Sequence, residues 1–301
     1  MSPLEALSGL AARCLDQKRL QALRLAYFTC RTKLHPLMRM LHGTFDAAAL
    51  RQHLDHRIGS DFDILMVHSS FNHLKPMYTG SPLQLVKMLM EYCGPGKTLV
   101  MPTFYFGDPL IGGAYTTLAL KPRYDLRRSP SQMGIVTEMF RRMPGVLQSR
   151  HPVYRVAAIG PMAKELTKGH EMTEYPIGIG SPFDYMANNN TRVIGIGKTY
   201  QVLTQAHHVE GVMGDAFPVP RATRPDLTVT VVDGQEEVQA TLTGRGLLWE
   251  FDIWKLRHIM GAKQLQEWRF RHVPLFSTRA AQVTAALLEA AQRGVTLYNR
   301  P

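Results

Sequence analysis

The strongest candidate for proton-transfer chemistry is the run TQAHHVEG, in which His207 and Glu210 stand three residues apart. On a helix, residues at this spacing share one face, so the carboxylate can orient the imidazole and favour its charged form. Such a pair suits a general base. A zinc pair and a purely structural polar face are the alternatives, although the His-Glu-x-x-His pattern of zinc proteases is absent.

A second candidate site lies in the run MVHSS, which places His68, Ser69 and Ser70 at the predicted end of an apolar strand. Ligands of open α/β sheets bind beyond the carboxyl ends of the strands. The serine hydroxyls and the N–H groups of that turn can hold a phosphate or an acyl oxygen. A structural role is an equal alternative, because serines are common in loops.

The run RVIGIGKTY resembles a phosphate-binding loop only in part. Arg192 stands where that loop requires a glycine, so we exclude a nucleoside-triphosphate site. The glycines are then best explained as strand residues that allow close backbone approach. His151 precedes Pro152, and a lone histidine before proline is more often structural.

The elements that must position these residues alternate between short apolar strands and helices. Ser-Pro pairs predict helix starts, because serine caps a helix and proline suits its first position; they stand at 2–3, 81–82, 129–130 and 181–182. Ser81 and Gln84 also form a capping box, and that helix is predicted to end at Gly94. Strands are predicted at residues 63–68, 97–104, 156–160 and 192–197.

This alternation predicts an α/β fold with a mixed, largely parallel central sheet covered by helices. Residues 227–243 differ, because two alternating runs meet at Asp233-Gly234 and predict a β-hairpin insertion. The segment TRAAQVTAALLEAAQRG predicts a last helix that ends at Gly294.

The first residues form a distinct part of the sequence. Residues 1–55 predict a basic helical extension, and residues 56–301 the α/β domain; residues 13–42 carry seven Lys or Arg and one Asp. An apolar helical stripe runs from Leu20 to Leu41, and Pro36 predicts that it divides into two helices. Packing against the domain is the simpler interpretation, and contact of residues 13–42 with an anionic membrane surface is the alternative.

Composition and net charge indicate which ligands and which cell compartment the protein suits. The 301 residues carry a formal charge of +11, which favours anionic ligands and suits a polycationic one poorly. Three scattered cysteines suit a reducing compartment, and no apolar run of 18 residues or basic secretory leader is found, so we expect a cytoplasmic protein. We expect no nucleic-acid partner, because basic residues are spread along the chain and no RNA-binding motif appears.

Taken in order, several segments resemble the aminoglycoside 3-N-acetyltransferase family. They are LMVHSSF (65–71), GPGKTLVMPTF (94–104), residues 124–152, GIGSPFDYM (178–186) and residues 192–210. The resemblance covers roughly residues 50–220. It implies an acetyltransferase-like α/β domain that moves an acetyl group from acetyl-CoA to the amine of an amino sugar or aminoglycoside-like acceptor, without a metal.

The resemblance also implies roles for single residues. His207 is then the general base and Glu210 its orienting carboxylate. Contacts to coenzyme A are expected from His68, Ser69, Ser70, Thr103, Phe104, Ser149 and His151, and contacts to the acceptor from Thr204, His208, Tyr105 and Asp125. The charge favours an anionic or lipid-linked amino sugar as acceptor.

Two other functions are kept as alternatives. The basic charge by itself fits a non-enzymatic module that binds nucleic acid or a membrane surface. His207, His208 and Glu210 together would fit a metal hydrolase.

Overall fold

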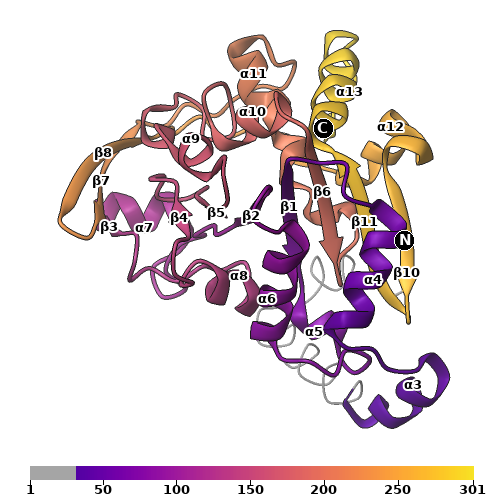
Figure 1. The fold of residues 1–301 in the computed structure, drawn as a ribbon. Helices are drawn as coiled ribbons and strands as arrows, with labels where there is room; N and C mark the ends of the chain where they lie inside the picture. Colours follow the sequence, from indigo (N-terminus) through magenta and orange to yellow (C-terminus); the bar gives the residue numbers. More distant parts are fainter. Residues whose placement is uncertain (1–31) are drawn as a thin grey trace.

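The computed structural model describes residues 32–301. The predicted helix start at residues 2–3 and most of the basic segment 13–42 therefore lie outside the described residues. The described chain contains a seven-stranded sheet with helices on both faces and a smaller three-stranded sheet at one side (Figure 1).

The seven-stranded sheet has the order β10-β11-β6-β1-β2-β5-β4. All four predicted strands are confirmed, as β1 (Ile64–Ser69), β2 (Thr98–Pro102), β5 (Val156–Ile159) and β6 (Thr191–Ile196). The others are β4 (Leu147–Gln148), β10 (Gln266–Phe270) and β11 (Val273–Arg279). Only the central pairs β6–β1 and β1–β2 are parallel, and the four outer pairs are antiparallel. The sheet is mixed, as predicted, but the expectation that it is largely parallel is wrong, because parallel pairing is confined to its centre.

Strand β1 is buried along its whole length because both faces of the sheet are covered. Ile64 and Met66 pack into one core, and Leu65 and Val67 into the other, as the two-residue period of a strand requires. The first core includes α9 (Ala163–Thr167), α10 (Pro182–Ala187), α12 (Leu256–Gln264) and α13 (Ala280–Gln292). The second includes α4 (Ala47–Ile58), α6 (Pro82–Cys93) and α8 (Ile135–Phe140).

Local capping fixes the ends of two helices that the Ser-Pro pairs predict. The Ser81 Oγ accepts from the Gln84 N–H at 3.1 Å, and the Gln84 Oε1 accepts from the Ser81 N–H at 2.7 Å, which completes the capping box of α6. The helix ends at Gly94, whose φ of 62° suits glycine. Helix α10 has a simpler cap, in which the Ser181 Oγ accepts from the Asp184 N–H at 3.3 Å.

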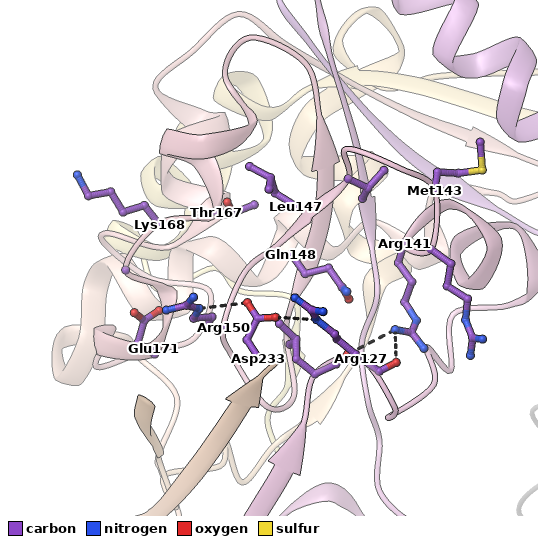
Figure 2. Close-up of a pocket in the computed structure, with 14 residues that line it drawn as sticks. Arg127, Arg141, Met143, Leu147, Gln148, Arg150, Thr167, Lys168, Glu171 and Asp233 are labelled. Carbon is purple, nitrogen blue, oxygen red and sulfur yellow. Dashed lines mark hydrogen bonds and ion pairs between the residues drawn. The ribbon is translucent and has the colours of Figure 1, made fainter. Parts of the chain in front are cut away.

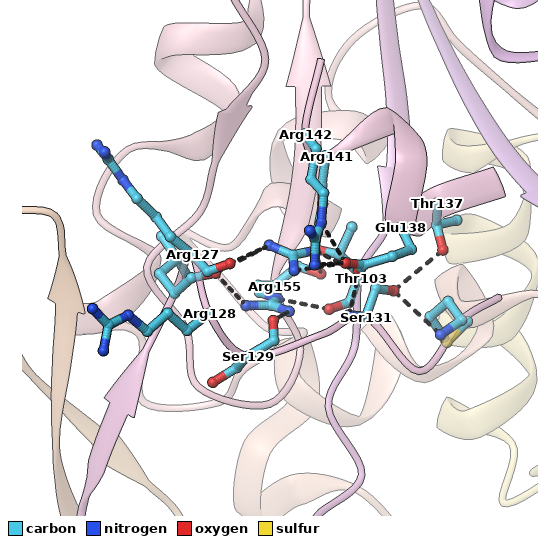
Figure 3. Close-up of polar contacts among 12 residues, drawn as sticks. Thr103, Arg127, Arg128, Ser129, Ser131, Thr137, Glu138, Arg141, Arg142 and Arg155 are labelled. Carbon is cyan, nitrogen blue, oxygen red and sulfur yellow. Dashed lines mark hydrogen bonds and ion pairs between the residues drawn. The ribbon is translucent and has the colours of Figure 1, made fainter. Parts of the chain in front are cut away.

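The pair Ser129-Pro130 begins no helix, so that prediction is wrong. The buried guanidinium of Arg155 accounts for this, because it donates to the carbonyl oxygens of Thr103, Leu126 and Ser129 at 2.7, 2.9 and 2.7 Å (Figure 3). These bonds hold residues 126–129 as a turn against β2. The next helix, α8, starts only after Gly134.

The predicted hairpin is confirmed. Strands β7 (Leu227–Asp233) and β8 (Glu236–Leu242) pair antiparallel, and Gly234 takes a φ of +68° in the turn. With β3 (Arg123–Asp125) they form the three-stranded sheet, against which α7 (Ala114–Leu120) packs. A short pair, β9 (Glu250–Phe251) with β12 (Tyr298–Asn299), brings the C-terminal residues back toward the domain.

Helix α3 (His35–His42) begins beside Pro36, as the predicted division at this proline requires. Helix α4 runs across residue 55, and its Leu50 and Leu54 are fully buried in the core of the sheet. The part of the chain from residue 47 onward is thus packed with the α/β domain. Within residues 32–301 no helix has the length and apolar character needed to cross a bilayer.

Candidate active site

His207 and Glu210 meet at the carboxyl end of the central strands, beyond β6. His207 ends a 3-10 turn (Thr204–His207), and Glu210 lies in the first turn of α11 (His208–Met213). The His207 Nδ1 lies 2.7 Å from the Glu210 Oε1, so the predicted contact between the two side chains is confirmed. Because a carboxylate only accepts hydrogen bonds, Nδ1 carries the proton and Nε2 is the basic nitrogen of the neutral ring.

Tyr298 is a third member of this group that the sequence did not reveal. Its hydroxyl donates to the same Glu210 Oε1 at 2.6 Å, and its side chain is only 7% exposed. The His207 ring stacks on Phe251 with 4.4 Å between centroids. Phe251 and Tyr298 are register partners in the β9–β12 pair, so one small element fixes both contacts.

Opposing effects act on the pKa of His207. Burial lowers this pKa. The charge of Glu210 and the hydrogen bond from His207 to Glu210 raise it, and together they outweigh burial, so the pKa lies above the ordinary value of a histidine. Burial also raises the pKa of Tyr298, as does the adjacent Glu210 carboxylate. Tyr298 therefore stays protonated and remains a donor.

The pair faces a cavity of about 470 Å³, here called the base cavity. Its walls are rich in aromatic rings and contain two arginines. The lining side chains include Tyr115, Tyr154, Tyr175, His207, Glu210, Arg221, Arg245, Trp249, Phe251 and Tyr298. This volume suits a small organic ligand.

A second cavity, of about 460 Å³, surrounds the predicted serines and is here called the serine-loop cavity. His68, Ser69 and Ser70 line it at the end of β1, as does Lys198, which follows β6. His68 is 2% exposed and neither ring nitrogen has a hydrogen-bond partner. Burial and the charge of Lys198 lower its pKa to about 3, so the ring is neutral. Lys198 belongs to the run GIGKTY, which the sequence analysis set aside.

Phe104 lies between the two cavities. It makes edge contacts with Phe106 of the serine-loop cavity, at 6.3 Å, and with Tyr154 of the base cavity, at 5.3 Å. Strands β1 and β6 are parallel neighbours, with Ser69 opposite Ile196, so the segments that carry the serines and His207 leave the sheet at one edge. The two cavities therefore flank one group of aromatic rings.

Other predicted site residues bind the protein's own backbone or core and line neither cavity. Thr103 donates its hydroxyl to the Arg155 carbonyl, and Ser149 accepts from the Val156 N–H. His208 lies between Thr284 and Asp184. Asp125 accepts from the N–H groups of residues 127 and 128. Tyr105 packs on Tyr124, and the Thr204 hydroxyl is buried without a partner.

His151, the histidine before Pro152, has a structural role in the turn that follows it. Its Nδ1 accepts from the N–H groups of Val153 and Tyr154, at 3.1 and 2.9 Å, and the ring is 1% exposed. Burial, followed by the neighbouring His170, holds its pKa well below the usual range. The neutral ring therefore fixes the backbone that presents Tyr154 to the base cavity.

A third cavity, of about 670 Å³, lies beside the hairpin turn and is here called the arginine cavity (Figure 2). Its four arginines are compensated by the protein itself. Asp233 lies between Arg127 and Arg150, and Glu138 pairs with both Arg141 and Arg142 (Figures 2 and 3). None of the predicted site residues lines it. In the described part of the chain, no cluster of three or more His, Cys, Asp or Glu side chains is arranged to hold a metal ion.

Comparison with known proteins places this geometry in a family. The aminoglycoside 3-N-acetyltransferase family model matches residues 66–292. Aminoglycoside N(3)-acetyltransferase IV of Salmonella sp is 31% identical over 160 residues, which are 52% of this chain and 56% of that protein. Aminoglycoside N(3)-acetyltransferase III of Serratia marcescens is 26% identical over 170 residues, 54% of this chain and 61% of that protein. The matched part thus spans little more than half of these curated relatives.

Solved structures share the fold over most of the chain. AAC-IIIb in a binary complex with CoASH superposes with a TM-score of 0.67 at 19% identity, covering 85% of this chain and 100% of that one. AAC-VIa bound to sisomicin gives 0.68 at 21% identity, covering 84% and 99%. At such identities the likeness shows the fold, which is the mixed α/β fold predicted, and the family model covers well over half of the sequence. This chain belongs to the aminoglycoside 3-N-acetyltransferase family.

Proposed function

We propose that the protein is an N-acetyltransferase that moves an acetyl group from acetyl-CoA to an amine of an amino sugar or aminoglycoside-like acceptor. The His207–Glu210 contact of 2.7 Å on the wall of the base cavity carries this proposal. Family membership supports it, as do the names of the relatives.

The proposed role of His207 is to accept a proton from the acceptor amine. An alkylammonium must lose a proton before its nitrogen can attack, and the free Nε2 of His207 is the basic atom on the cavity wall. The neutral amine nitrogen then forms a bond to the acetyl carbon and the carbon–sulfur bond breaks. The second proton that this nitrogen loses ends on the released thiol, and the first passes from His207 to solvent. Glu210 stabilises the imidazolium while His207 holds the proton, and Tyr298 keeps the Glu210 carboxylate in place.

The serine-loop cavity is the proposed site of coenzyme A. Its buried His68 ring has no hydrogen-bond partner, and the Lys198 ammonium lines the same cavity, so an extended anionic ligand can interact with both groups. Ser69 and Ser70 supply hydroxyls for the thioester oxygen or a phosphate. When bound, acetyl-CoA supplies the activated acetyl group.

Substitution of His207 by alanine tests the proposal. General-base assistance contributes about 10²- to 10⁴-fold in rate, so His207→Ala should lower kcat by about that factor. Release of the coenzyme A thiol in the presence of an amine acceptor reports turnover. His258→Ala, a change at an exposed histidine of α12, is the matched control and should keep wild-type activity. Full activity of the His207→Ala protein, with an unchanged melting temperature, would refute the role of His207.

A further inference from the structure

Cationic side chains outnumber carboxylates on the walls of the base cavity. Arg221 and Arg245 line it, and Glu210 is the one carboxylate among its described lining residues. The Glu210 Oε1 already accepts from both His207 and Tyr298. An acceptor with several ammonium groups would therefore meet more positive than available negative charge at this wall.

Arg221 is held in place without being neutralised. Its Nη2 donates to the carbonyl oxygens of Glu210 and Gly214, at 2.9 and 3.0 Å, and its guanidinium lies over the Tyr175 ring at 4.9 Å. Its Nε is buried and has no hydrogen-bond partner. No carboxylate of residues 32–301 forms an ion pair with it. The side chain is thus fixed, with donors and a positive charge left over.

The other arginines that line the arginine cavity and the base cavity all form ion pairs. The four arginines of the arginine cavity each share a carboxylate, either Asp233 or Glu138. Arg245, at the base cavity, lies 3.4 Å from Asp215 and 3.8 Å from Glu174. Both of these carboxylates are mostly exposed, at 79% and 73% of their side chains. Their charge is screened by solvent and is committed to Arg245.

The base cavity adjoins another cavity at Arg221. A neighbouring cavity of about 400 Å³ shares Arg221 and Trp249 with the base cavity and adds Arg300 and Asp215. Arg221 thus stands at the junction of two hollows. It contacts the backbone of Glu210, whose side chain holds His207, so the free cation and the base are on one wall.

We propose that the acceptor is an amino sugar that carries an anionic group, a phosphate or a carboxylate, and that Arg221 binds this group while the amine faces His207. The inference rests on the acetyltransferase function proposed above and names its substrate class. A guanidinium with free donors suits both anions, because its planar fork matches their oxygens. The aromatic walls offer the flat faces on which a sugar ring packs.

Matched acceptors separate the effect of charge from that of the amine. The full chain is assayed with acetyl-CoA and glucosamine, glucosamine 6-phosphate, 2-amino-2-deoxyglucuronate or gentamicin C1a, and each acceptor's affinity is measured separately by calorimetry. The phosphate and uronate arms identify which anion Arg221 prefers. We expect kcat/KM and affinity for at least one anionic amine to exceed those for glucosamine by about 10- to 100-fold, the range of a charge-assisted contact.

Variants assign the preference to Arg221. Arg221→Gln should remove the 10- to 100-fold preference, measured as the ratio of kcat/KM for the anionic amine to kcat/KM for glucosamine in the same variant, so that any general loss of activity cancels. Arg221→Lys keeps the charge and should retain part of the preference, which covers the case in which Arg221→Gln folds poorly. Arg128→Gln removes the same charge from a side chain that is 91% exposed and lines none of the four cavities, and it should behave as wild type.

Three outcomes would overturn the inference, and they differ in what they say about the reaction. Gentamicin C1a as the best acceptor would leave the acetyltransferase function standing and refute the anionic acceptor. Anionic amines that bind no more tightly than glucosamine would also refute it, with or without turnover. Failure to bind coenzyme A and to acetylate any amine would refute the proposed function and this inference with it.

Discussion

Replacing Glu210 by glutamine removes the charge beside His207 while keeping an oxygen that can accept its two hydrogen bonds. In the wild-type protein Glu210 raises the pKa of His207 against the effect of burial. In Glu210→Gln burial acts unopposed, so the pKa of His207 should fall below its ordinary value. The neutral ring is the active form, and the acidic limb of the pH–rate profile should therefore move to lower pH.

The rate should fall at the same time. The imidazolium that forms during proton transfer loses a charge-assisted hydrogen bond, which is worth about 1.5–3 kcal/mol. At 1.36 kcal/mol for each factor of ten, kcat at the pH plateau should drop by about 10- to 150-fold. The His207 and Glu210 side chains are 32% and 17% exposed, so solvent screening places the effect toward the lower end.

Stability should depend on pH with the sign set by the same pair. Because the folded pKa of His207 is raised, its stabilisation is fully present below the unfolded value of about 6.5 and is lost as the pH rises through the folded pKa. In Glu210→Gln this contribution should reverse, so acidification below about pH 6.5 should destabilise the variant.

The assay is thiol release followed from acidic to alkaline pH, with chemical unfolding at the same pH values. Glu165→Gln is the matched control, because its carboxylate is 59% exposed, pairs with Lys168 and lines none of the three cavities. A Glu210→Gln protein with a plateau rate within threefold of wild type and an unmoved acidic limb would refute this account of the pair.

Two further substitutions test contacts that the fold supplies. Tyr298→Phe deletes one donor to the Glu210 carboxylate, so the free energy of unfolding should fall by about 1.5–3 kcal/mol. Without this donor, Glu210 should interact more strongly with His207 and raise its pKa, so the acidic limb of the pH–rate profile should move to higher pH, opposite to Glu210→Gln. A shift of this limb to lower pH would contradict the prediction. Arg155→Met removes a donor from the buried carbonyls of Thr103 and Leu126 and from the half-buried carbonyl of Ser129, at about 1–3 kcal/mol each, so urea unfolding should show a loss of several kcal/mol. A loss under about 1 kcal/mol would show that Arg155 does not hold this turn.

The elements whose signals are local could be predicted from the amino-acid sequence. The apolar runs of β1, β2, β5 and β6, the capping box of α6 and the hairpin turn at Gly234 involve residues within a few positions of each other. The His207–Glu210 contact belongs to this class, because a spacing of three residues places both side chains on one face of a helical turn. Local backbone geometry follows from such patterns.

The surroundings of the His207–Glu210 pair come from segments far apart in the chain and could not be predicted. Tyr298 reaches Glu210 across 88 residues, and Arg155 overrides the helix start at Ser129-Pro130 through contacts to residues 26, 29 and 52 positions away. Thr103, Ser149 and His151 stand in family-like motifs, yet they bind the chain's own backbone. Hydrogen bonding and charge compensation depend on which distant segments come into contact. The periodicity of a strand or helix predicts only which residues share a face, and it does not predict those contacts.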